Sequence, residues 1–287
     1  MKTNTDISHS GLKNTCARER AFTLTDLLVV MATLAILAAV MLPALARSGD
    51  NGARVVCSNN LRQMGMALNM YVEENQDTMP WVNWGNDFSP PCPRGWLYSP
   101  DPNTPNNLYT GNAANDASLW STGRVANLKP GLYWQYLQNP DVFMCPVDAL
   151  SVGSTPWENR YNKLSTYIMN GASAFFPALG RGNIYQYRTC KMSQIWSPWC
   201  IINWEPNPVG SSISWNDGSS YPNSSEGPSI GLHVAGANVL TVGGSTKFMS
   251  FADVLAEMNN PPANNAHGSK GLLWWNPNQQ NGHGVGM

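Results

Sequence analysis

The chain has 287 residues, which is enough for one or two domains. Its 17 Lys and Arg residues almost balance its 18 Asp and Glu residues, so the formal net charge is −1. Charged residues make up 12% of the chain, against about 25% in ordinary domains. Because nucleic-acid-binding proteins carry a clustered basic surface, this composition excludes nucleic acid as the expected partner. Instead, it suits an exported, loop-rich domain.

An uncharged stretch near the N-terminus predicts a helix that crosses a membrane. From Leu27 to Leu42, sixteen residues contain no charge, no Gly and no Pro. Together with residues 22–25, the stretch approaches the roughly 20 apolar residues that span a bilayer as a helix. We expect a transmembrane segment over residues 22–45, preceded by a polar leader, residues 1–21, that takes no part in the fold.

The start of this stretch resembles the N-terminus of type IV prepilins and type II secretion pseudopilins. A short basic leader ends at Ala21, the run FTLTDLLVV begins at Phe22, and Pro43 lies where many pilin helices carry a kinking proline. That family usually has Gly before the cleavage point and Glu as the acid, whereas this chain has Ala21 and Asp26.

The resemblance implies a processed filament subunit. A prepilin peptidase would cleave between Ala21 and Phe22, and the new Phe22 amine would be N-methylated. Asp26 would pair with the Phe22 amine of a neighbouring subunit and set the stagger between subunits. The expected location is the inner membrane, with a periplasmic or cell-surface C-terminal domain. The expected partners are the membrane, an assembly platform and other copies or other pilins in one filament.

Two other interpretations of the apolar stretch remain open. A secretory signal peptide also has basic residues, an apolar run and a cleavage site between small residues. Cleavage after Ala44-Leu45-Ala46 would release a soluble protein that begins at Arg47. Alternatively, the stretch is a membrane anchor that is never processed.

Beyond the apolar stretch, the pattern changes to a one-sided helix. Apolar residues recur at helical spacing over residues 53–75, which predicts an amphipathic continuation that packs on a domain. Residues 48–52 (SGDNG) lower helix propensity and predict a softened stretch or a short break. The expected helix therefore covers residues 22–75. The residues of the predicted stripe are Leu61, Met64, Leu68 and Tyr71.

Three later segments resemble large pilin-like families of planctomycetes and verrucomicrobia. They are residues 57–80, the segment GLYWQYLQNPDVFMCPVDA, and a hairpin that in those families carries His, nine residues and then Asp-Gly. Here His233 precedes Gly243-Gly244, so Gly replaces the Asp. Two glycines between β-prone runs favour a two-residue turn with positive φ. We interpret Cys145 and Asp148 as parts of a structural corner.

These observations predict an α+β, pilin-like fold. A long N-terminal helix would pack its second half on a twisted antiparallel sheet, and long loops would cover the rest. Residues 76–258 would form a globular, loop-rich β domain that includes a buried strand over residues 199–204. Residues 259–287 would form an irregular, poorly ordered tail despite Trp274 and Trp275.

The six cysteines are too widely spaced for a zinc ribbon, which uses close pairs. We therefore expect no metal site and no cofactor, with Asp217 and Glu226 as weak calcium candidates in a polar loop. An oxidising exterior permits disulfides. The pairs to test are Cys190 with Cys200 and Cys92 with Cys145.

No catalytic motif is present in the sequence, so we do not expect an enzyme. The 12 tryptophans suggest an alternative function, since exposed aromatic faces bind sugars. A secreted or anchored carbohydrate-binding module is therefore the rival to the filament subunit. Against it, Trp side chains also pin down loop-rich cores, because each buries a large area.

Overall fold

The structure is a computed structural model, and it divides the chain into two compact units. These are Met1–Ser48 (unit 1) and Gly49–Met287 (unit 2). Side chains of residues 42–48 lie outside the description. The structure describes residues 23–83, 93–99, 123–154, 157, 160, 162–174, 189–206, 218–220, 222, 232–234, 236–258 and 271–277.

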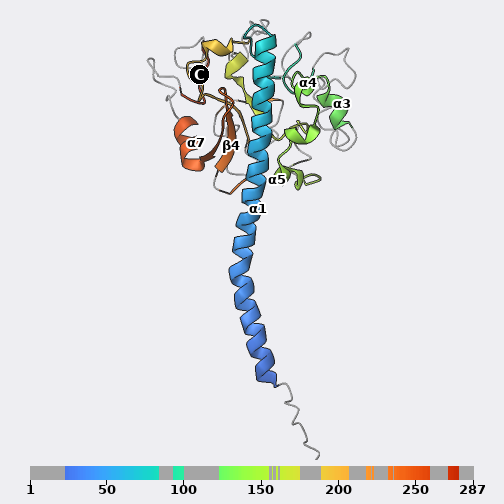
Figure 1. Ribbon diagram of the computed structural model, residues 1–287, viewed down its shortest axis with the longest axis vertical. Coiled ribbons are helices and arrows are strands. Elements are labelled where there is room, and N and C mark those ends of the chain that lie inside the picture. Colours follow the sequence, from blue (N-terminus) through green and yellow to red (C-terminus); the bar gives the residue numbers. More distant parts are fainter. Residues whose placement is uncertain are drawn as a thin grey trace, which may run out of the picture. The chain divides into compact units, whose positions relative to one another are not determined.

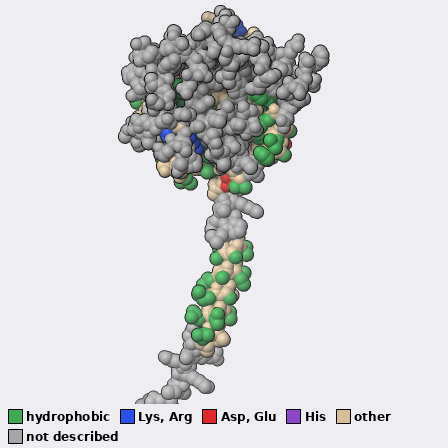
Figure 2. All heavy atoms as spheres, turned by 180° about the vertical axis from the view of Figure 1, so that it is seen from behind, with side chains coloured by type: hydrophobic (Ala, Val, Ile, Leu, Met, Phe, Trp, Pro, Cys, Tyr) green, Lys and Arg blue, Asp and Glu red, His purple; other side chains and the backbone are tan. Residues whose placement is uncertain are grey.

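Helix α1 (Leu24–Glu74) begins in unit 1 and confirms the predicted long helix to within two residues at each end. Gly49 and Gly52 lie inside it, so the helix has no break at residues 48–52. Its segment Leu24–Met41 is long and apolar enough to cross a membrane, and none of it is buried inside the protein. Hydrophobic side chains surround this part of unit 1 (Figure 2).

In unit 2, α1 presents the predicted apolar stripe to the core. Leu61, Met64 and Leu68 are fully buried, and Tyr71 is partly buried against them. On one side, Arg54 lies 3.3 Å above the ring of Phe248 in the last strand. On the other, the Asn60 side chain donates to the carbonyl of Met144 at 3.0 Å. The helix therefore lies between the sheet and a group of short helices (Figure 1).

The sheet is mixed, which corrects the prediction of a purely antiparallel one. Its strand order is β3-β1-β2-β4-β5, and only the edge pair β1–β3 is parallel. The other three pairs are antiparallel. All positions of β2 and β4 are buried, because both faces of the central sheet are covered. The strands are β1 (Ile168–Asn170), β2 (Ile201–Trp204), β3 (Ser219–Ser220), β4 (Gly236–Thr241) and β5 (Thr246–Ser250).

The predicted hairpin is formed by β4 and β5, but its loop is longer than expected. Thr241 donates its N–H to the Ser245 carbonyl and accepts the Gly244 N–H, which leaves three loop residues. Of the two glycines, Gly244 has a positive φ, +81°. This is the three-residue hairpin loop that ends on a left-handed glycine. Gly65 of α1 packs on it so closely that a Cβ there would lie 3.3 Å from the Gly244 Cα.

Short helices and one irregular segment complete unit 2. Residues 271–277 lie in the predicted tail, yet Leu273 and Trp275 are fully buried. The Ile201 N–H donates to the Leu272 carbonyl, and the Trp275 indole N–H donates to the Ile201 carbonyl. These two bonds attach residues 271–277 to β2. The tail is therefore not uniformly loose. The helices are α3 (Arg124–Leu128), α4 (Trp134–Leu137), η1 (Pro140–Phe143), α5 (Pro146–Ala149), η2 (Gly171–Ala174), η3 (Met192–Gln194) and α7 (Phe251–Met258).

The apolar stripe of α1 makes a direct prediction about stability. Met64→Ala should lower the free energy of unfolding by about 2–5 kcal/mol, because it removes a buried side chain and leaves a cavity. Met66→Ala on the same helix is the matched control: Met66 is 54% exposed whereas Met64 is fully buried. Its effect should stay within about 0.5 kcal/mol. Chemical unfolding followed by Trp fluorescence measures both; equal losses would contradict the packing described.

Candidate functional site

The start of α1 carries the acid singled out by the sequence. Thr23 caps the helix: its hydroxyl accepts the Asp26 N–H at 3.2 Å. The Asp26 carboxylate in turn accepts the Thr23 N–H at 3.0 Å and its hydroxyl at 2.7 Å, both through Oδ2. The two residues thus form a reciprocal capping box, which satisfies N–H groups that a helix start leaves without partners.

For the other residues predicted for processing and assembly, the structure describes less than it does for Asp26. Ala21 and Phe22 lie outside the described residues. Pro43 lies within α1, but its side chain is not described. Structure therefore places Asp26 at the first turn of the apolar helix, while the pairing of Asp26 with a subunit amine stays a prediction.

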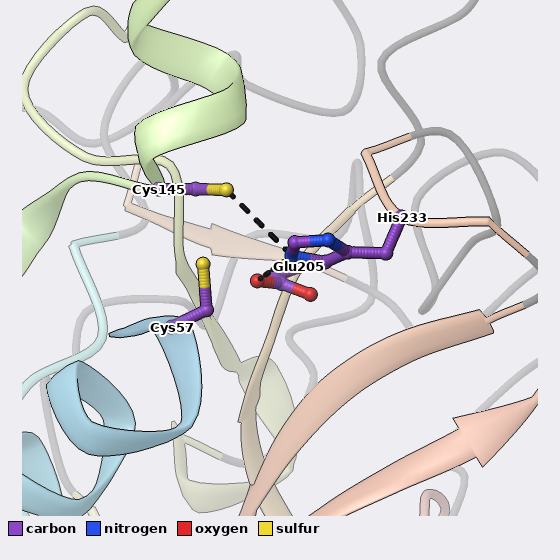
Figure 3. A group of neighbouring side chains, drawn as sticks. All are labelled: Cys57, Cys145, Glu205 and His233. Carbon is purple, nitrogen blue, oxygen red and sulfur yellow. Dashed lines mark hydrogen bonds and ion pairs between the residues drawn. The ribbon is translucent and has the colours of Figure 1, made fainter. Parts of the chain in front are cut away.

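A second group of functional side chains lies buried in unit 2. Its ligand-type atoms all lie within 4.8 Å of one another, and Figure 3 shows the two sulfurs, the imidazole and the carboxylate turned toward a common point. The exposed fraction of each residue is 0–1%. We call this group the Cys–His–Glu cluster; its members are Cys57, Cys145, Glu205 and His233.

Helix α1 and a tight corner supply the two thiols. Cys57 lies on the buried stripe of α1, one turn before Leu61. Cys145 precedes α5, and its N–H donates to the Thr166 hydroxyl at 3.0 Å. That hydroxyl donates to Asp148 at 2.7 Å, and Arg160 clamps the same carboxylate with bonds of 2.6 and 2.8 Å. The structural corner predicted around Cys145 and Asp148 is confirmed, and it fixes the position of the Cys145 thiol.

The end of strand β2 supplies the carboxylate. Glu205 follows β2 and faces Asn238 of β4, whose carbonyl accepts the Glu205 N–H. The Asn238 N–H and side-chain amide donate to Glu205 Oε2 at 2.7 and 3.0 Å. These bonds hold Oε2, so Oε1 is turned to the imidazole of His233, 3.3 Å from its Nε2. A bulge in β2 between Ile201 and Asn203 shifts the register ahead of this residue.

His233 completes the cluster from the segment that leads into β4, where it bridges to Gly236. Its Nε2 faces the cluster, 3.7 Å from the Cys145 sulfur. Its other ring nitrogen, Nδ1, lies 3.0 Å from a carboxylate oxygen of Asp50 on α1. The ring is therefore oriented from both sides, with one nitrogen directed to the cluster and the other held by an acid.

The side chains of the cluster shift one another's pKa. A hydrogen bond from Cys57, with a further one to His233, lowers the pKa of the Cys145 thiol to about 7, although burial acts in the opposite direction. A hydrogen bond with Cys145 and burial raise the pKa of the Cys57 thiol far above its ordinary value. Burial would lower the pKa of His233, but its bonds with Cys145 and the two carboxylates raise it to about 10. The surrounding groups thus stabilise positive charge at this point.

The structure describes three of the four cysteines in the disulfide pairs that the sequence suggested. Cys145 lies beside Cys57, while Cys92, its predicted disulfide partner, is outside the described residues. The Cys190–Cys200 disulfide is not formed, because Cys190 is an unoxidised buried thiol. Their backbones make different hydrogen bonds: the Cys190 N–H donates to the Ser173 carbonyl and the Cys190 carbonyl accepts the Met79 N–H, whereas the Cys200 carbonyl accepts the Val242 N–H.

The Cys–His–Glu cluster is not predictable from the sequence, because its four residues lie far apart along the chain. Cys57 looked like one more apolar residue of a helical stripe, and no spacing links it to Cys145 or Glu205. One signal was present: Cys57, Cys145 and His233 all lie in the three segments that resemble the same pilin-like families. The sequence pattern around His233 predicts a hairpin and gives no paired His spacing that would indicate a metal site. The calcium candidates Asp217 and Glu226 fall outside the described residues.

No family model, curated protein or solved structure matches this chain. Conclusions about function therefore depend on the chemistry of the chain itself. Two features carry them: the exposed apolar segment of α1 with Asp26 at its start, and the buried Cys–His–Glu cluster in unit 2.

The corner that positions Cys145 gives a testable prediction. Asp148→Ala should lower the free energy of unfolding by about 3–5 kcal/mol, because it leaves the buried Arg160 guanidinium without its carboxylate. Glu73→Ala, at an exposed position of α1, is the control and should change it by less than about 0.5 kcal/mol. Denaturant titration of the full-length protein measures both. A loss below about 1 kcal/mol for Asp148→Ala would contradict the role of this ion pair.

Proposed function

We propose that the protein is a structural subunit of a type IV pilus-like filament or a type II secretion pseudopilus, processed by a prepilin peptidase and N-methylated at Phe22. This proposal rests on the segment Leu24–Met41, which is helical and apolar and has no part buried inside the protein. Such a surface needs lipid or sister helices around it, since large exposed apolar patches mark membrane or protein contacts.

Asp26 would fix the axial position of each apolar helix relative to its neighbour. A carboxylate at the centre of a bilayer costs roughly 2.5–3.5 kcal/mol, less near its edge, and is retained where a partner neutralises it. Among the described residues, both bonds from Thr23 to the Asp26 carboxylate use Oδ2, so Oδ1 would be the oxygen that takes a cation. The proposed partner is the α-amine of a processed Phe22 in the neighbouring subunit. Sliding of one helix along its neighbour would then separate two opposite charges in a water-poor environment.

Unit 2 would be the part of the subunit displayed outside the membrane. Its helix segment is bound to the core through a buried stripe, so force on the helix is passed to the whole unit. The proposed location is the inner membrane before assembly, with unit 2 on the periplasmic side. The mechanism is physical: the helix moves from lipid into a helical bundle, and a separate ATPase of the assembly platform supplies the work.

N-terminal mass analysis of the protein from membranes tests the processing step. The expected result is a chain that begins at N-methylated Phe22. A chain that begins at Arg47 would show a secretory signal peptide, and an intact residue 1 would show an unprocessed anchor; either result would refute the proposal.

Crosslinking tests the register role of Asp26 with variants that separate charge from capping. Asp26→Asn keeps an oxygen that can accept the Thr23 N–H but has no charge, so ladders of crosslinked subunits should be lost. Asp26→Glu keeps the charge and should retain them. If Asp26→Asn assembles as well as the parent chain, Asp26 acts only as a helix cap.

Carbohydrate binding is a second candidate, and the exposed side chains of Trp196 and Trp199 favour it. They are 51% and 50% exposed, while most other tryptophans in the described residues are buried. Lys247 lies 4.1 Å above the Trp199 ring, so that face is partly covered. If this surface binds glycans, hits on a carbohydrate array should disappear in Trp196→Ala and Trp199→Ala. An array without hits would remove this candidate.

A further inference from the structure

We propose that the Cys–His–Glu cluster binds one Zn²⁺ ion as a structural site that fastens helix α1 to the rest of unit 2. This inference goes beyond the filament function and does not depend on it. The four side chains come from α1, the corner before α5, the end of β2 and the segment before β4. They converge on one point although they are far apart in sequence (Figure 3).

The distances between the ligand atoms fit a tetrahedral ion. Zn²⁺ bonds of about 2.3 Å to sulfur and about 2.0 Å to nitrogen or oxygen put neighbouring ligand atoms about 3.3–3.8 Å apart. The structure has 3.3 Å between His233 Nε2 and Glu205 Oε1, and 3.7 Å between Nε2 and the Cys145 sulfur. All ligand atoms lie within 4.8 Å of one another, so small side-chain rotations close the site.

The donor set and its burial identify the kind of ion. Two sulfurs, one imidazole and one carboxylate form a mixed donor set that suits Zn²⁺, and structural zinc sites are closed by four protein ligands. Hard ions such as Ca²⁺ and Mg²⁺ take oxygen ligands. Because each residue of the cluster is at most 1% exposed, the arrangement fits a structural ion better than a catalytic one with an open position. Binding would release the protons of the two thiols and of His233 Nε2.

The groups around the ligands fix their orientation. A zinc-bound histidine usually donates its other ring N–H to a carboxylate or carbonyl. Here Asp50 holds Nδ1 of His233 at 3.0 Å. Asn238 holds Oε2 of Glu205 with two short bonds and reaches Oε1 only at 3.3 Å, so Oε1 is the oxygen that faces His233 and the cluster. Asp50 and Asn238 are thus positioning residues, and neither would touch the ion.

The main rival is a disulfide between Cys57 and Cys145. Unit 2 would be exported under the proposed function, and disulfides form in oxidising compartments. A disulfide requires the sulfurs about 2.05 Å apart, and it would remove both thiolates as ligands. It would leave the imidazole and the Glu205 carboxylate, both buried, as an ion pair without a metal. The two states differ in mass and in metal content, so a single measurement separates them.

The test uses the full-length protein, purified in detergent from membranes whose free thiols are alkylated at lysis. Native mass spectrometry and elemental analysis should find one Zn²⁺ per chain, with Cys57 and Cys145 protected from alkylation until a chelator is added. Chelation should lower the melting temperature, and Zn²⁺ should restore it. A disulfide between Cys57 and Cys145, a different metal, or reduced thiols that take up no added Zn²⁺ would each overturn the proposal.

Variants locate the ion. Cys57→Ser and Cys145→Ser should lose zinc, whereas Cys190→Ser should retain it, because Cys190 is a buried thiol outside the cluster. If a ligand variant fails to fold, the parent chain still decides: replacement of zinc by Co²⁺ should produce the thiolate-to-cobalt charge-transfer absorption of a tetrahedral site. Absence of that absorption in Co²⁺-treated, reduced protein would refute two-thiolate ligation.

The positioning role of Asp50 has its own readout. Asp50→Asn should weaken zinc affinity about 10–100-fold in a chelator competition, without a change in the Co²⁺ spectrum, since the ligands themselves remain. The exposed Asn51→Ala on the neighbouring position of α1 is the control and should leave affinity unchanged. Equal affinity for Asp50→Asn and the parent chain would contradict orientation of His233 by Asp50.

Discussion

The burial of one face of helix α1 is the constraint on which the rest of unit 2 depends. Cys57, Leu61, Met64 and Leu68 lie at steps of four, three and four residues, and each is fully buried. That spacing keeps side chains on one helix face. The sheet packs on one side of this helix and the short helices on the other, so a unit with short strands and long irregular segments is organised around a single rigid element.

The same constraint explains where the Cys–His–Glu cluster lies. Once the stripe is buried, Cys57 is carried inward with it, and Asp50 lies about two turns earlier on the same helix. Three polar or ionisable groups from other segments then meet Cys57 in a fully buried region. Buried charges persist only when they are paired or coordinated. The corner around Asp148, the bonds from Asn238 and the bond to Asp50 supply that pairing.

The two features serve different parts of the proposed filament subunit. Unit 1 has an apolar, unburied helix surface, which in the proposed filament would contact lipid or neighbouring helices, with Asp26 setting the register. Unit 2 must stay folded while its helix is pulled, and a structural ion that joins α1 to three other segments would oppose separation of the helix from the sheet. Most of the described tryptophans are buried in this core rather than displayed, which fits a structural role for them better than sugar binding.

Periodic and local signals were enough to predict the long helix, its apolar first half, its buried stripe, the β4–β5 hairpin and the corner at Asp148. These features follow from interactions within a few residues or from a regular repeat. The parallel β1–β3 edge, the burial of Leu273 and Trp275 and the three-residue loop at Gly244 depend on which distant segments meet, so local patterns mispredicted them. The cluster is the extreme case: its ligands are separated by 88, 60 and 28 positions (57 to 145, 145 to 205, 205 to 233), and only tertiary packing brings them within bonding reach.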